Sequence, residues 1–167
     1  MPYVLIALTI ILRLLPHPFG LTPVGALGLF AGSYCSPKIA WLVPLIALAV
    51  GDLLGGGYNI VVFVCVYIGF LAGPLFGYLL LRKKRNPARL IIAAFTAALI
   101  FFIVSNFGIW LAGMYPPTLA GLVECYVNGL PYFRMALIGD LVYSGILFGA
   151  AELFRRYTKQ NMPSSDF

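Results

Sequence analysis

The sequence predicts an all-α, polytopic membrane protein with six transmembrane helices. Of its 167 residues, 62% are hydrophobic and only 10% are charged. A soluble domain of this length has too little interior to bury so much apolar surface, so the surrounding solvent must be the lipid bilayer. The apolar runs are long and continuous rather than alternating, which favours helices over a β-barrel. We therefore expect one transmembrane domain over residues 1–157 and a polar cytoplasmic tail over residues 158–167.

Turn residues divide the apolar sequence into six runs. The first run is shorter than the roughly 20 residues that a span usually needs, and it ends at Pro16-His17-Pro18. Glycines spaced by three or four residues in the second, fourth and sixth runs are typical of closely packed membrane helices. The expected helices cover residues 3–15, 22–34, 39–54, 60–81, 90–112 and 134–154, with a short extra helix at 118–128 in the last outer loop.

Basic residues predict which end of the bundle faces the cytoplasm. The strongest charge run is residues 82–89, and the positive-inside rule places such a run on the cytoplasmic side. Six spans then put both termini on that side, together with Lys38, Arg155, Arg156 and Lys159. The net charge of +6 is thus explained by orientation in a bilayer, and we expect no nucleic-acid partner.

Several polar residues fall in the opposite, outer half of the expected helices. Asn106 is the central one, and it lies four residues before Trp110, on the same helical face. An amide in hydrocarbon is costly without a partner, so Asn106 is expected to face inward. The candidate substrate-binding residues are Arg13, His17, Asp52, Asn106, Trp110, Glu124, Tyr126, Arg134, Asp140 and Tyr143.

Two interpretations of these outer polar residues remain open. In one, Arg13 and Arg134 neutralise Asp52 and Asp140 in ion pairs that brace the bundle, because buried charges need partners. In the other, the polar residues surround an outward-facing pocket for a small molecule, covered by residues 113–133. The two are compatible, since ion pairs can brace a pocket.

No motif in the sequence indicates an enzyme or a resident cofactor. Two intramembrane aspartates occur in aspartyl proteases, but here both are expected near the outer surface, and sharing a proton requires close carboxylates. No glycine loop with a lysine is present to hold a nucleotide phosphate. His17 is either a metal ligand or an interfacial hydrogen-bonding group. Cys125 is either a packing residue or a ligand for a metal that the bound molecule carries.

Three segments resemble the substrate-binding S components of energy-coupling-factor (ECF) vitamin transporters. They read LVPLIALAVGDLL at 42–54, SNFGIW at 105–110 and LIGDLV at 137–142. A second resemblance covers nearly the whole chain and is to an uncharacterised bacterial family of proposed transport membrane proteins. The segments that carry it read RLLPHP at 13–18, TPVGAL at 22–27 and PPTLAGLVECY at 116–126.

The resemblance to S components implies a six-helix bundle in a bacterial inner membrane, with an outward pocket for a vitamin or a similar micronutrient. It also implies a coupling subunit and an ATPase pair as partners. S components often carry small residues spaced by four on the first helix, where the coupling subunit docks, whereas Ala7 is followed here by Ile11. A solitary S component is therefore a second expectation. Its ligand would resemble cobalamin, and Cys125 would coordinate the metal that this ligand carries.

Two other functions remain as alternatives. One is a structural or assembly membrane protein with no small-molecule ligand, which would dock a partner through the glycine faces of the second and fourth helices. The other is a channel or self-sufficient transporter. A channel requires a polar path through the cytoplasmic half of the bundle, and the sequence provides few polar residues there.

Overall fold

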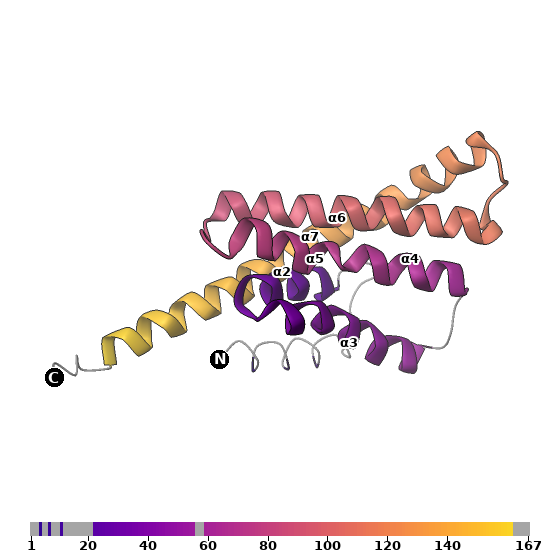
Figure 1. Cartoon of the computed structure of the whole chain (residues 1–167). Coiled ribbons are helices and arrows are strands. Elements are labelled where there is room, and N and C mark those ends of the chain that lie inside the picture. Colours follow the sequence, from indigo (N-terminus) through magenta and orange to yellow (C-terminus); the bar gives the residue numbers. More distant parts are fainter. Residues whose placement is uncertain (1–3, 5–6, 8–10, 12–21, 56–58, 162–167) are drawn as a thin grey trace.

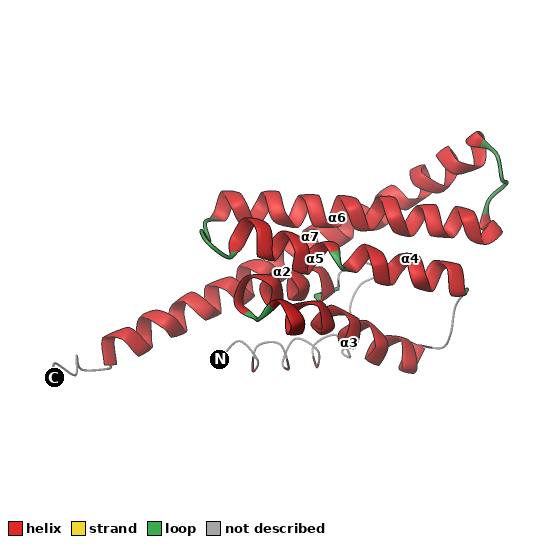
Figure 2. Cartoon of the chain, viewed as in Figure 1, coloured by secondary structure: helices red, strands yellow, loops and turns green. Residues whose placement is uncertain are grey.

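The computed structural model is a helical bundle, shown along the chain in Figure 1 and by secondary structure in Figure 2. It describes residues 4, 7, 11, 22–55 and 59–161, and within these it contains no strand. The expectation of an all-α fold is confirmed for this part of the chain, while the expected first helix falls almost entirely outside it. The helices are α2 (Val24–Tyr34), α3 (Pro37–Gly55), α4 (Ile60–Phe70), α5 (Ala72–Phe76), η1 (Gly77–Leu81), α6 (Pro87–Ile109), η2 (Trp110–Met114) and α7 (Leu119–Asn161).

Three stretches are long and apolar enough to cross a membrane: Ile60–Leu81, Pro87–Met114 and Leu119–Gln160. The first of these joins α4, α5 and η1, and the second joins α6 to η2. The helix α2 is also apolar but has only 11 residues, fewer than a full span needs. A membrane-type helical core is therefore present in the described residues.

The loop at 82–86 and the loop at 115–118 lie at opposite ends of the bundle (Figure 1). At the first of these ends, arginines bind free carbonyl groups, which is the favourable place for a cation at the end of a helix. Arg82 donates to the carbonyl of Cys35 at 3.2 Å, and Arg89 donates to the carbonyl of Leu80 at 3.2 Å. The turn after α2 and the loop before α6 are thereby held together at the basic end.

Glycines bring α2 against α5 and η1. A Cβ atom at Gly28 would lie only 2.9 Å from Cδ of Pro74 and 3.2 Å from Cα of Gly73. A Cβ atom at Gly32 would overlap the carbonyl oxygen of Pro74, and one at Gly77 would overlap the backbone of α2. The close packing expected from the glycines of the second and fourth runs is confirmed, and it occurs within the chain.

The helix α7 corrects one expectation. The sequence predicts a short helix that ends before Gly129 and a new helix from Arg134, but α7 is continuous over 43 residues with Pro131 inside it. Gly129 does not end the helix because it lies against the side-chain amide of Asn106, where a Cβ atom would overlap that amide. The role of Gly129 is therefore packing rather than capping. The helix α7 also continues to Asn161, into the tail expected over residues 158–167.

The glycine contact can be tested with a matched pair of alanine variants. Gly32→Ala forces a methyl group into the backbone of Pro74, and we expect a loss of about 1–3 kcal/mol in unfolding free energy. Gly145→Ala is the control, since a Cβ atom there meets nothing within 4 Å. It should leave stability unchanged or raise it by up to ~1 kcal/mol through helix propensity.

Denaturant or thermal unfolding of the full chain in detergent gives both values. Equal stability of the two variants would contradict the close contact between α2 and Pro74.

Candidate functional site

A cavity of about 370 Å³ lies between α2, α3, α4, α5, α6 and α7. It is bordered by the later turns of α6 and by the end of α3, so it occupies the half of the bundle away from the loop at 82–86. Small-molecule sites in proteins are typically about 300–1,000 Å³ and mostly apolar, with a few polar groups. Aromatic rings supply much of this wall, from Phe70, Phe101, Phe102, Tyr132 and Phe133. Three of the predicted polar residues also line it, Asp52, Asn106 and Asp140.

Asp140 joins α7 to the beginning of α2. Its side chain is only 6% exposed, and Oδ1 accepts a hydrogen bond from the backbone N–H of Ala26 at 3.0 Å. Ala26 lies in the first turn of α2, where the N–H groups have no partner within the helix and the helix dipole favours a negative charge. Gly25 makes this approach possible, because a Cβ atom there would overlap both carboxylate oxygens. Asp140 therefore caps α2 from another helix.

Asp52 enters the cavity from the end of α3. Its Oδ2 atom accepts a hydrogen bond from the hydroxyl group of Tyr67 at 2.9 Å. Tyr67 belongs to α4 and stacks on Phe63, with ring centroids 4.0 Å apart. The carboxylate is thus held in place by an ordered ring on the neighbouring helix.

Asn106 faces the interior from α6, as the sequence predicts, with 7% of the residue exposed. Its Nδ2 atom donates to the carbonyl of Phe102, one turn earlier, at 2.8 Å. The thiol of Cys125 lies 3.3 Å from the backbone carbonyl of Asn106, to which it donates, and Gly129 covers the amide. Cys125 itself is buried and does not border the cavity, so its thiol is used in helix packing.

Trp110 and Tyr126 lie toward the end of the bundle that carries the loop at 115–118, and neither lines the cavity. The indole nitrogen of Trp110 donates to the carbonyl of Pro116 at 3.0 Å, which ties η2 to the loop at 115–118. The hydroxyl group of Tyr126 donates to the carbonyl of Ile103 at 2.7 Å. The backbone N–H of Trp110 bonds to the carbonyl of Asn106, as in a regular α-helix, so Trp110 follows Asn106 by one turn but is not among the residues that line the cavity.

The remaining predicted residues are divided between the surface, the core and the part of the chain outside the described ranges. Glu124 and Arg134 are exposed on α7. Tyr143 packs against the apolar cluster around α2 and α3. Arg13 and His17 lie outside the described residues.

The ion-pair interpretation fails for Arg134. Among residues 22–55 and 59–161, ion pairs join Glu152 to Arg155 and Arg156, and none joins Arg134 to an aspartate. Asp140 is stabilised instead by the N-terminus of α2. A pairing with Arg13 stays a prediction.

Sequence reasoning missed the phenylalanine rings of the wall and the hydrogen-bonding partner of Asp52. A signal was present on α6, where Phe102 and Ile109 share the face of Asn106 at helical spacing and line the same cavity. Tyr67 carried no comparable signal, because its contact with Asp52 depends on how α3 and α4 pack.

A family profile matches residues 1–163 of the chain. The chain belongs to the DUF6580 family, a family of unknown function. No curated protein matches it, and no solved structure does. The described residues of this DUF6580 protein include no group of three or more His, Cys, Asp or Glu side chains that is arranged to hold a metal ion.

The capping role of Asp140 in this DUF6580 protein predicts a difference between two substitutions. Asp140→Ala leaves the N–H of Ala26 buried without an acceptor, and we expect a loss of about 1–3 kcal/mol in unfolding free energy. Asp140→Asn keeps an oxygen acceptor and should lose less than half of that. Equilibrium unfolding in detergent measures both, and equal losses would contradict the cap.

Proposed function

We propose that the protein is the substrate-binding membrane subunit of a transport system that takes up a vitamin or a similar micronutrient. The observation that carries the proposal is the cavity of about 370 Å³, with aromatic walls and with Asp52, Asn106 and Asp140 at its border. A few polar groups that converge on an apolar pocket are the usual composition of a small-molecule site. In this proposal the ligand enters from the outer side, and the protein catalyses no reaction.

The proposal includes six crossings of a bacterial inner membrane, with both termini in the cytoplasm. The three long apolar stretches supply three crossings, and the first helix, α2 and α3 supply the others. Hydrogen bonds from Arg82 to Cys35 and from Arg85 to Ser33 support this orientation, because they join two turns that six crossings place on the same side. The positive-inside rule makes that side cytoplasmic.

The size and lining of the cavity support a compact ring compound as the ligand. A volume of about 370 Å³ is at the lower end of the range for small-molecule sites, which disfavours a ligand as large as cobalamin. The use of the Cys125 thiol in a bond to Asn106 disfavours a role in binding a ligand-borne metal. The carboxylate of Asp140 accepts one bond from Ala26, and a carboxylate has room for several more, so a ligand with N–H or O–H donors fits best.

The energy for transport would come from a coupling subunit and an ATPase pair, unless the protein works alone. The structural or assembly alternative is weakened by the packing of Gly28, Gly32, Gly73 and Gly77. These residues form the faces through which that alternative would dock a partner, and they are covered within the chain by α2, α5 and η1.

Binding to the full chain in detergent tests the proposal. Native mass spectrometry of the purified protein should detect a retained small molecule, and a panel of water-soluble vitamins should include one that raises the melting temperature. Asp52→Asn and Asn106→Ala should each weaken that binding by about tenfold or more, because each removes a polar contact in a buried site.

Glu124→Gln is the matched control, since Glu124 is an exposed acid on α7 that does not line the cavity. Its affinity should equal that of the wild type. Unchanged affinity in both cavity variants, or no binding of any kind by the wild type, would contradict the proposal.

A further inference from the structure

A second cavity, of about 680 Å³, lies at the basic end of the bundle. It is bordered by the end of α2, by the loop at 82–86, by the start of α6 and by the later turns of α7. Its lining has two chemically different parts. One part is a rim of charged side chains, and the other is an apolar floor made by Leu81, Leu90, Phe148 and two glycines of α7.

The rim is strongly cationic. Lys83, Arg85, Arg155 and Arg156 border the cavity, and Glu152 is the one acidic residue among its described lining residues. Glu152 contacts Nε of Arg155 at 3.4 Å and Nε of Arg156 at 3.1 Å. One carboxylate thus orients two guanidinium groups but neutralises only part of their charge.

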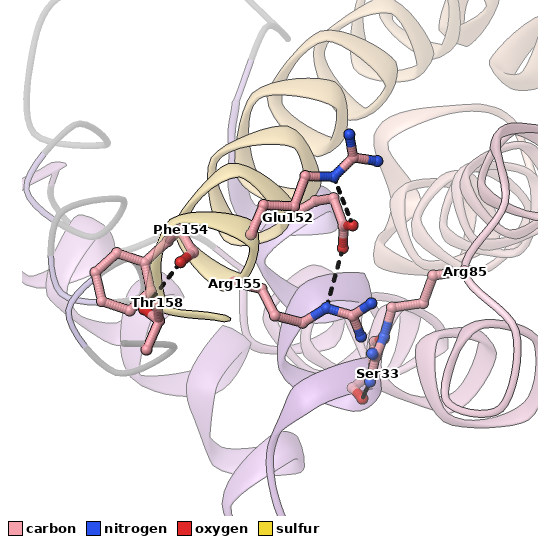
Figure 3. A network of polar contacts seen from close by, with 7 residues as sticks. Ser33, Arg85, Glu152, Phe154, Arg155 and Thr158 are labelled. Atoms are coloured by element: carbon pink, nitrogen blue, oxygen red, sulfur yellow. Dashed lines mark hydrogen bonds and ion pairs between the residues drawn. The ribbon is translucent and has the colours of Figure 1, made fainter. Parts of the chain in front are cut away.

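Arg85 is held rigidly beside this pair. Its Nε atom donates to Oγ of Ser33 at 2.9 Å, its Nη2 atom donates to the carbonyl of Ser33 at 3.0 Å, and its Cζ atom lies 4.1 Å from the ring centre of Tyr34. Figure 3 shows the guanidinium groups of Arg85 and Arg155 directed to the same region, and Glu152 bonded to Arg155. Two guanidinium groups that border one cavity repel each other, and a bound anion relieves that repulsion.

The floor next to this rim is open. Gly145 and Gly149 lie one helical turn apart on the exposed side of α7, and a Cβ atom at either would meet nothing within 4 Å. The sequence indicates that this glycine pair packs against another helix, but within the described residues no helix covers it. With Phe148 and Leu90, the pair forms an apolar groove that continues from the arginines.

We propose that this cleft binds an anionic phospholipid of the cytoplasmic leaflet. The headgroup phosphate lies between Arg155, Arg156 and Arg85, and an acyl chain lies over Gly145 and Gly149. Basic pockets between transmembrane helices on the cytoplasmic side are suited to anionic headgroups, and arginine suits phosphate because its planar group donates in pairs. A free phosphate ion would bind the same arginines as the headgroup but would make no contact with the apolar floor.

The test uses the purified full chain and three probes: dioleoyl phosphatidylglycerol, dioleoyl phosphatidylcholine and inorganic phosphate. Native mass spectrometry and titration in detergent should show one tightly retained phosphatidylglycerol and no comparable binding of phosphatidylcholine. The double variant Arg155→Gln/Arg156→Gln should weaken phosphatidylglycerol binding by at least about tenfold, because it removes charge-assisted hydrogen bonds. Both arginine side chains are 72% exposed, so the variant should still fold.

Two further variants separate the possible outcomes. Gly149→Leu fills the floor and should weaken phosphatidylglycerol binding without changing the arginines. Lys159→Gln removes a positive charge from the same helix, outside the lining of the cavity, and should leave affinity unchanged.

Three results would overturn the proposal. Equal binding of phosphatidylcholine would exclude recognition of charge. An equal loss in Lys159→Gln would indicate non-specific attraction. Competition by inorganic phosphate, with no effect of Gly149→Leu, would assign the site to free phosphate instead of lipid. This cleft and the cavity of about 370 Å³ lie at opposite ends of the bundle. The outcome of the lipid test therefore does not decide the outcome of the micronutrient-binding test.

Discussion

The first turn of α2 has to find hydrogen-bond acceptors inside the bundle, and Asp140 supplies one. The residues from Val24 to Ser33 are all buried, so water does not serve the start of this helix. A buried N–H group without a partner costs about 1–3 kcal/mol, and more than one such group is present at a helix N-terminus. The bond from Ala26 to Asp140 meets part of this need and places a carboxylate at the border of the outer cavity. The same contact therefore satisfies one N–H group at the start of α2 and holds one of the three polar side chains at the cavity.

The unpaired backbone groups at the two ends of α2 bind side chains of opposite charge. At the basic end, arginines bind the carbonyl groups at the C-terminal end of α2, as Arg85 does at Ser33. At the opposite end of α2, the carboxylate of Asp140 binds the N–H group of Ala26. Both arrangements follow the direction of the helix dipole, which favours cations at the C-terminus and anions at the N-terminus. The charged partner at each end of α2 thus has the sign that the dipole of this short helix favours.

Much of the helical core could be predicted from the sequence, because hydropathy and helical spacing are local properties. The burial of Asn106 and Asp140 at the cavity could be predicted, because each lies within an apolar run at a depth that follows from its position in that run. The errors concern features that depend on packing. Gly129 and Pro131 are local signals for a break, but α7 continues because Gly129 packs on Asn106. Trp110 does not line the cavity, and its indole nitrogen bonds instead to the carbonyl of Pro116 in the loop at 115–118.

The cavity is space between the helices that the side chains of the described residues do not fill. Unfilled space between helices lowers stability, because the apolar atoms that border it lose packing contacts. Around α2 the chain avoids such cost by packing glycines against backbone, so close packing is attainable in this fold. Water can satisfy Asp52, Asn106 and Asp140 but gains little from the rings that make up the rest of the wall. In the function that we propose, a molecule with a polar edge and a flat apolar face satisfies both parts of the wall.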